Sequence, residues 1–363
     1  MFKVLDFWLD KGVKGFRLDT INFLLEDEAL RDNPVTDEVP EYLKRVLSIK
    51  QLPIYTVNRP ENHHVIKALR QHLSRKGDEE PLLIGEVFVP TVRDLVPYYG
   101  DQGDEIQLPF NFFLSNVDKL SAASFRQVLA QDSEYLSHYP TTTVLSNHDL
   151  PRATTRYASE ENSDAVAKLL ATMLFTLRGA PFIYYGSEIG MRDCPPETID
   201  EVQDPRGKLD WPEYKGRDGA RTPMQWSDKE NAGFTKGSPW LKLNPDYVQR
   251  NVKAQLANPN SILNYYKKLI ALRQSWSSLR RGKLTLLGED PSVLAYLREQ
   301  QDDPILVLLN MSEEKSLFRG DNFEPLSQKA LKVLASTHSV ATENFPSLRL
   351  TLKPFEGLVL KSD

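Results

Sequence analysis

The sequence predicts an α/β protein in which a parallel sheet is followed by a small antiparallel β domain. In the first part of the 363-residue chain, short apolar runs alternate with amphipathic helical patterns, as is typical of repeated βα units. Beyond Gly282 the pattern changes to short strands broken by Gly, Asn, Asp and Pro. We therefore assign residues 1–278 to an α/β domain, with a long loop region at about 186–260, and residues 279–363 to an all-β domain.

The individual elements follow from the spacing of apolar residues. A helical stripe opens the chain and ends at Gly12. Five candidate strands come next, at residues 15–19, 82–87, 106–110, 142–146 and 181–185. Helical spacing predicts helices around residues 65–73, 125–129, 166–177 and 262–272, and the β domain has candidate strands at 293–297, 305–309 and 348–352. Because helices separate the first five strands, we expect those strands to be parallel.

Composition narrows the classes of function. The net charge of -5 provides no broad basic field, so neither nucleic acid nor a membrane is a predicted partner. A single cysteine, Cys194, excludes an internal disulfide and a multi-cysteine metal site. The adjacent His63 and His64 point apart at a helix start, so no metal or cofactor is predicted. Without a signal peptide or an apolar run of membrane-spanning length, a cytoplasmic protein acting on a small polar ligand is expected.

Three acids lie at the carboxyl ends of candidate strands: Asp19, Glu86 and Asp149. The ends of parallel barrel strands face one mouth, so these acids are expected to converge. Retaining glycoside hydrolysis needs one carboxylate as nucleophile and a second as acid and then base, about 5 to 5.5 Å away. A single acid at a strand end is more often a helix cap or a loop acid. Three in βα order favour the catalytic interpretation.

The neighbours of these acids suggest separate roles. Arg17 lies two residues before Asp19 and shares its face of a strand, so its charge favours an ionised nucleophile. Glu86 lies in an apolar stretch, which favours the protonated acid. His148, beside Asp149, can donate to a sugar hydroxyl. A structural Arg17–Asp19 ion pair and a core histidine are the alternatives.

Several motifs resemble those of the α-amylase superfamily. GFRLDTINF (residues 15–23), IGE (84–86) and SNHD (146–149) resemble its signatures at the fourth, fifth and seventh barrel strands, and GAPFIYYGSE (179–188) resembles the eighth. GRDG (216–219) and RTPMQW (221–226) resemble the branch of maltases, oligo-1,6-glucosidases and trehalose synthases. The resemblance implies the C-terminal portion of a (β/α)8 TIM barrel, strands 4 to 8, followed by an antiparallel β domain.

The same resemblance implies a role for each site residue. Asp19 is expected to be the nucleophile, Glu86 the acid/base and Asp149 the stabiliser of the transition state. The expected substrate-binding residues are Arg17, Thr20, His148, Arg217 and Arg221, with Arg221 favoured over Arg217 as the arginine nearest the sugar.

Thr20 provides a clue to the linkage. In this branch a valine after the nucleophile often accompanies α-1,6 activity, and a threonine accompanies α-1,4 activity. Thr20 therefore favours a maltase-like α-glucosidase that releases glucose from a disaccharide or short oligosaccharide. One pocket contact is worth about 1 to 3 kcal/mol, which supports a preference between linkages.

Three alternatives stay open. A trehalose synthase or transglucosidase shares the same covalent intermediate. Family members have three further βα units before the strand of Asp19, so the chain is expected to lack the N-terminal part of the barrel, and an inactive fragment is the second alternative. The third is a non-catalytic relative such as an amino-acid transporter heavy chain. The presence of all three acids argues against that one.

Overall fold

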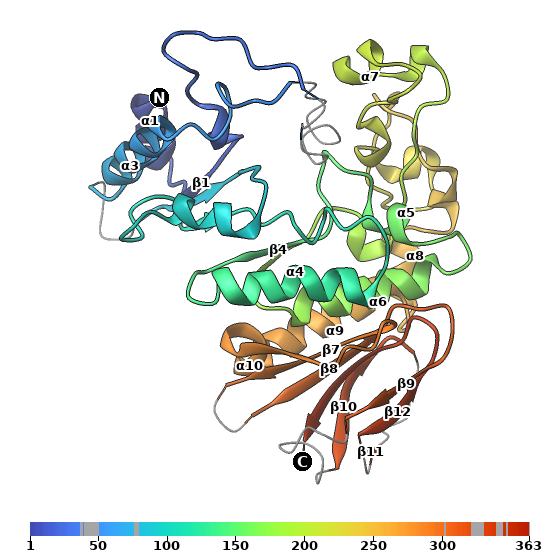
Figure 1. Cartoon of the computed structure of the whole chain (residues 1–363). Coiled ribbons are helices and arrows are strands. Elements are labelled where there is room, and N and C mark those ends of the chain that lie inside the picture. The colour runs from blue at the N-terminus through green and yellow to red at the C-terminus, as the bar shows by residue number, and fades with distance from the viewer. Residues whose placement is uncertain are drawn as a thin grey trace. The chain divides into compact units, whose positions relative to one another are not determined.

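The computed structural model describes residues 1–36, 39, 51–75, 80–300, 303–320, 330–338, 344–345 and 348–362. The chain divides into two compact units (Figure 1): unit 1 contains Met1–Asn116 and Ala130–Thr143, and unit 2 contains Val117–Leu129 and Val144–Asp363. Each unit is described by itself. The domain boundary placed at residue 278 rests on the change of sequence pattern and stays a prediction.

Unit 1 is built on a parallel sheet of three strands in the order β1-β2-β3. Its strands are β1 (Gly15–Leu18), β2 (Leu82–Gly85) and β3 (Leu108–Pro109). All three lie within the predicted ranges and end earlier than predicted. The register pairs Leu18 with Gly85, so β1 and β2 end side by side.

Helices pack on this sheet through their apolar faces. They are α1 (Phe2–Asp10) and α3 (Glu61–Leu73), accompanied by the 3-10 helices η1 (Ile21–Phe23) and η2 (Val92–Tyr99). Leu5 of α1 and Leu73 of α3 share one buried cluster with Leu83 of β2. Full burial of such a side chain contributes about 1.5 to 3 kcal/mol. The core of unit 1 therefore fixes the two strands whose ends carry Asp19 and Glu86.

The helical layer of unit 2 centres on α6 (Ser163–Thr176) and α9 (Ile262–Ser275), which match the predicted helices. The rings of Phe175 and Tyr266 meet edge to face, with centroids 5.4 Å apart. Further elements are α4 (Ala122–Tyr135), β4 (Thr142–Val144), α5 (Ala153–Tyr157), β5 (Ala180–Phe182) and α10 (Ser277–Arg281). Strands β4 and β5 pair in a two-stranded sheet, and both α4 and β4 contain residues of each unit.

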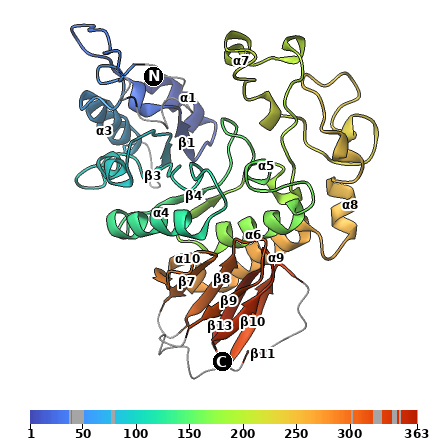
Figure 2. The same cartoon turned by 45° about the vertical axis from the view of Figure 1, so that its right-hand side comes forward.

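An antiparallel sheet forms the C-terminal part of unit 2, in the strand order β11-β10-β13-β8-β7-β6. The strands are β6 (Lys283–Leu287), β7 (Val293–Glu299), β8 (Ile305–Asn310), β10 (Leu331–Ser336), β11 (Asn344–Phe345) and β13 (Gly357–Ser362), with β9 (Ser316–Arg319) and β12 (Arg349–Leu352) as a separate pair. In both views the sheet lies against α9 (Figure 1 and Figure 2). The buried Arg298 donates to the carbonyls of Thr176 and Gly282, which joins β7 to the helical layer.

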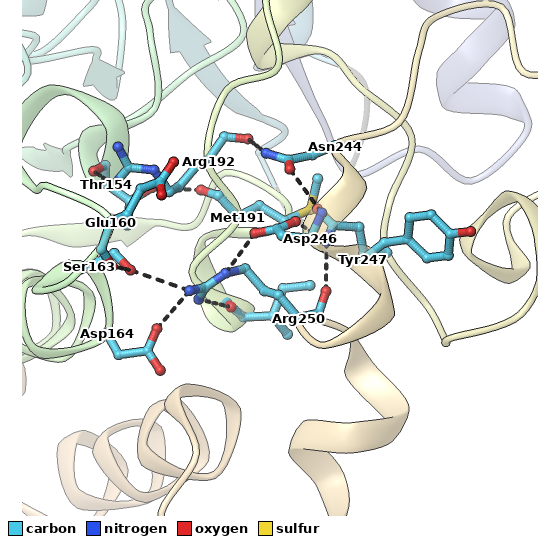
Figure 3. Close-up of polar contacts among 12 residues, drawn as sticks. Thr154, Glu160, Ser163, Asp164, Met191, Arg192, Asn244, Asp246, Tyr247 and Arg250 are labelled. Carbon is cyan, nitrogen blue, oxygen red and sulfur yellow. Dashed lines mark hydrogen bonds and ion pairs between the residues drawn. The ribbon is translucent and has the colours of Figure 1, made fainter.

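The long loop region contains many short helical turns. They are η3 (Ser187–Ile189), η4 (Ile199–Glu201), α7 (Pro205–Leu209), η5 (Asp218–Ala220), η6 (Glu230–Gly233), η7 (Pro245–Val248) and α8 (Val252–Ala257). Two arginines fasten it to the helical layer (Figure 3): Arg192 donates to the carbonyl of Thr154, and Arg250 donates to the carboxylate of Asp164 at 2.8 Å. Within the loop region, Arg250 also donates to the carboxylate of Asp246 at 3.0 Å. Polar anchoring explains how a region without apolar periodicity holds a defined conformation.

In the described part of the chain, no helix combines the length and the apolarity that crossing a membrane requires.

Candidate active site

Asp19 and Glu86 lie side by side in unit 1. Each is the first residue after its strand, and the strands β1 and β2 are paired neighbours. Backbone hydrogen bonds continue past the strand ends, from Glu86 N to the Leu18 carbonyl at 2.9 Å and from Ile21 N to the Glu86 carbonyl at 3.0 Å. The positions of the two acids are therefore set by the sheet and by the backbone that continues it.

One guanidinium joins the two carboxylates. Arg17 donates through Nη1 to Asp19 and through Nη2 to Glu86. The sequence predicted the first contact and missed the second, since Arg17 stands opposite Ile84 in the register and reaches across to the neighbouring strand. The expectation of an apolar setting for Glu86 is therefore incomplete: the side chain is buried, and a positive charge that the sequence did not predict lies against its carboxylate and favours the ionised form.

The two acids differ in their access to solvent. The Asp19 side chain is 73% exposed, whereas that of Glu86 is 3% exposed. The neighbouring position is tightly packed as well, because a Cβ at Gly85 would lie 2.7 Å from the Ile21 side chain. An accessible carboxylate thus stands beside an enclosed one, and a single arginine contacts both.

Thr20, which connects Asp19 to η1, adopts a strained backbone conformation. Its φ of 39° and ψ of 51° lie in the left-handed region, which β-branched residues rarely adopt. Its N–H points to the Glu86 carboxylate at 3.4 Å. Strain of this kind concentrates at functional sites, which agrees with the choice of Thr20 as a site residue.

Asp149 lies in unit 2 at the centre of a second cluster of charges. The Asn147 side chain accepts from the Asp149 N–H at 3.0 Å, which fixes the turn after β4. Arg217 and Arg221 both donate to Oδ1 of Asp149, each at 2.9 Å. His148 Nε2 lies 3.3 Å from the other oxygen, and Arg221 Nε donates to the His148 carbonyl at 2.8 Å. The structure thus brings four predicted site residues together.

Asp204 is a member of this cluster that the sequence did not reveal. It accepts two hydrogen bonds from the Arg217 guanidinium, at 2.8 and 2.9 Å. Arg217 holds the pKa of the Asp204 carboxyl well below its usual range, and Asp204 in turn raises the pKa of Arg217. The only sequence signal was the Asp-Pro pair at 204–205, which is typical of a helix start. Both arginines contact Asp149, so the expectation that Arg221 is the arginine nearer the sugar stays a prediction.

The chain matches the family model described as "Alpha amylase, catalytic domain" over residues 1–282. It is 32% identical over 391 residues to an oligo-1,6-glucosidase of Bacillus cereus, an alignment that covers 99% of this chain and 67% of the relative. It is also 35% identical over 318 residues to a probable alpha-glucosidase of Rhizobium meliloti, covering 85% of this chain and 56% of that protein.

A solved structure shows the same relationship. The isomaltulose synthase of Klebsiella sp. LX3 superposes with a TM-score of 0.85 at 29% identity, over 100% of this chain and 67% of that one. Neighbours of this kind indicate a TIM barrel followed by a C-terminal β domain, which confirms the predicted fold class at that level. They also support a glycosidase whose substrate is a carbohydrate. The chain belongs to the α-amylase catalytic-domain family of glycoside hydrolases.

Proposed function

We propose that the chain is a retaining α-glucosidase that releases glucose from short α-1,4-linked glucosides. The observation that carries the proposal is the Asp19–Glu86 pair at the ends of neighbouring strands, with both carboxylates in contact with one guanidinium. Two carboxylates that contact the same guanidinium lie close together. This favours the separation of carboxyl groups found in retaining enzymes, about 5 to 5.5 Å, over the roughly 6.5 to 9.5 Å found in inverting ones.

In this mechanism the exposed Asp19 attacks the anomeric carbon, and Glu86 gives a proton to the departing glycosidic oxygen. Arg17 favours the ionised form of both carboxylates while it contacts them. Sugar hydroxyls that draw Arg17 away from Glu86 would let Glu86 hold the proton that the leaving group needs. Glu86 then takes a proton from water, and the water hydrolyses the covalent intermediate on Asp19.

Asp149 is proposed to stabilise the transition state. Its carboxylate is 16% exposed and accepts hydrogen bonds from Arg217 and Arg221, which fix its position. Hydrogen bonds that sugar hydroxyls donate to such a carboxylate strengthen as the ring distorts. His148, which adjoins it, is proposed to donate to another hydroxyl of the same glucosyl unit.

Thr20 is proposed to set the preference for α-1,4 over α-1,6 linkages. It directly follows Asp19, and its strained backbone fixes the direction of the side chain at the edge of the site. Several relatives are named oligo-1,6-glucosidases, so linkage is the feature most in need of measurement.

The five strands β1 to β5 are further proposed to correspond to the fourth to eighth strands of the barrel. Their motifs follow the order of that family's signatures, and β1, β2 and β3 are parallel neighbours as this assignment requires.

The test is the stereochemistry of hydrolysis by the full chain. Incubation with 4-nitrophenyl α-glucoside should release nitrophenolate, and proton NMR should show α-glucose as the first anomer formed. β-Glucose as the first product would contradict the two-step mechanism. With maltose, glucose is expected as the main product. No turnover by a chain that gives a cooperative unfolding transition would contradict the proposed activity of these 363 residues.

An isomerase or transglucosidase is the second candidate, favoured by the TM-score of 0.85 to the isomaltulose synthase structure. Both reactions pass through the same covalent intermediate and differ in whether water or a sugar hydroxyl attacks it. Trehalose as the main product from maltose, or a rearranged disaccharide from sucrose, would select this candidate.

A further inference from the structure

We infer that the buried Arg152 is a positioning residue that holds Arg221 and Arg217 against Asp149. Arg152 is 1% exposed, and its guanidinium donates to the backbone carbonyls of Tyr185 and Ala220. Its structural role rests on geometry within unit 2 alone. Its consequence for catalysis rests on the proposed function.

The Arg152 side chain connects two loops. Nη1 donates to the carbonyl of Tyr185, just after β5, at 2.5 Å. Nη2 donates to the carbonyl of Ala220, the last residue of η5, at 2.9 Å. Ala220 immediately precedes Arg221 and follows Arg217 by three positions. The hydrogen bond to its carbonyl therefore restrains the backbone segment that carries both arginines.

Two tyrosines restrain the same backbone segment. The hydroxyl of Tyr184 donates to the Ala220 carbonyl at 2.9 Å, and that of Tyr185 donates to the Thr222 carbonyl at 2.6 Å. The Arg152 guanidinium lies 4.8 Å from the centre of each tyrosine ring, as in a cation–π contact. The carbonyls on both sides of Arg221 are thereby fixed by groups that follow β4 and β5.

The backbone of Arg152 anchors the other side of the cluster. Its N–H donates to the two carboxylate oxygens of Asp193, at 3.0 and 3.2 Å. Arg152 lies three residues after Asp149 on the same loop. One residue therefore ties down the loop of Asp149 through its backbone and the loop of the two arginines through its side chain.

The surroundings are shaped for an arginine. Gly186 has a φ of +85°, and a Cβ there would lie 3.0 Å from Arg152 Nη1 and 2.4 Å from the Met191 sulfur. A lysine has a single ammonium group on a flexible stem, so it cannot keep the carbonyls of Tyr185 and Ala220 and both ring contacts together. Burying a charged group costs free energy unless the group makes hydrogen bonds in the folded protein. A side chain that only filled space at this position would therefore be better apolar than charged.

The experiment compares Arg152→Lys and Arg152→Met with Arg298→Lys in the full chain. Arg298 is a matched control: it is 0% exposed and also donates to two backbone carbonyls, of Thr176 and Gly282. Hydrogen–deuterium exchange across residues 217–223 should rise in both Arg152 variants and stay at the wild-type level in Arg298→Lys. Unchanged exchange there in Arg152→Met would overturn the inference. This readout does not depend on enzymatic activity.

Kinetics on 4-nitrophenyl α-glucoside test the catalytic consequence, with active sites counted by a slow fluorinated glucosyl donor. Arg152→Lys should lower kcat per active site by about 10- to 100-fold, as expected of misplaced catalytic groups, with a smaller change in KM. A variant that merely unfolds would lose active sites and keep its kcat. That second pattern would overturn the positioning role.

A double-mutant cycle with Arg221→Lys tests whether Arg152 affects kcat through Arg221. If Arg152 acts through Arg221, the effect of Arg152→Lys on kcat should largely vanish in the Arg221→Lys background. Additive effects would overturn that route. Absence of activity in the wild-type chain, together with loosening of residues 217–223 in the Arg152 variants, would refute the proposed function and leave the structural role standing.

Discussion

The two clusters of acids use arginine in opposite ways. In unit 1 one arginine, Arg17, serves two carboxylates, one of them 73% exposed. In unit 2 two arginines, Arg217 and Arg221, donate to the single carboxylate of Asp149. Arg217 also donates to Asp204, which restrains its guanidinium. A shared guanidinium leaves a pair of acids whose protonation depends on where that charge lies. A carboxylate held by two arginines is fixed in position.

Under the proposed function, this contrast suits the clusters to different tasks. Groups that must exchange protons and form a covalent bond suit the first arrangement, and a group that must present unchanging negative charge suits the second. Changes to the acids of unit 1 should therefore abolish steps of the reaction. Changes around Asp149 should act by displacing a group that remains chemically intact.

Asp19→Asn should have the largest effect. An amide cannot serve as the nucleophile, so kcat/KM on 4-nitrophenyl α-glucoside should fall on the order of 10⁴-fold or more. Asp10→Asn, at the exposed end of α1, is the isosteric control and should behave as wild type. Substantial activity in Asp19→Asn would mean that the two acids of unit 1 do not divide the chemistry as proposed.

Glu86→Gln should separate the two chemical steps. Its kcat/KM on maltose should fall by about 10² to 10⁴-fold, and much less on nitrophenyl glucosides, whose leaving group needs no proton. Added azide should rescue the second step and yield an α-glucosyl azide. Glu105→Gln is the control, because Glu105 is as buried as Glu86 and instead pairs with His63 at 2.7 Å. Equal losses on both substrates would refute the acid role.

Thr20→Val should change specificity more than rate. Loss of the hydroxyl is expected to shift the ratio of kcat/KM for maltose over isomaltose toward isomaltose by about 10-fold. The measurement is competition between the two disaccharides, with glucose release from each followed separately. If the ratio stays constant while both rates fall, Thr20 acts through its strained backbone conformation and does not determine the linkage preference.

The smallest expected effect concerns the stability of unit 2. Arg217 lowers the pKa of Asp204 in the folded state, so the folded chain favours the ionised carboxyl. This contribution is fully present above the unfolded aspartate pKa of about 3.9 and is lost progressively as the pH falls from there through the lower pKa of the folded state. Denaturant unfolding from pH 7 to pH 3 should show the difference between wild type and Asp204→Asn shrinking with acidification. The exposed Asp200→Asn should show no such convergence.

The cluster in unit 1 was largely predictable because local sequence determines it. Each acid follows an apolar strand, and parallel pairing places the ends of β1 and β2 together. The reach of Arg17 to Glu86 was missed, since it depends on the register between strands that are 67 positions apart, as the pairing of Gly15 with Leu82 shows. A pattern that identifies strands does not specify which residues stand opposite each other.

The cluster in unit 2 was predictable only in part. The motif around Asp149 was evident, whereas Asp204 and Arg152 were not, because their partners are backbone carbonyls and arginines on loops without periodicity. The strands of the first part of the chain were also predicted too long, since buried apolar residues such as Val87 continue past the last residue of their strand. Burial extends beyond regular structure, so apolar runs overestimate the length of strands.

The most direct test of the central claim is to identify the residue that becomes glucosylated. The chain, with Glu86→Gln to slow turnover, would be treated with a 2-fluorinated α-glucosyl donor, digested and examined by mass spectrometry. The proposed mechanism predicts one fluoroglucosyl group on the peptide that contains Asp19, and none in the Asp19→Asn variant. A label on any other residue, or turnover of ordinary substrates without a trappable adduct, would contradict it.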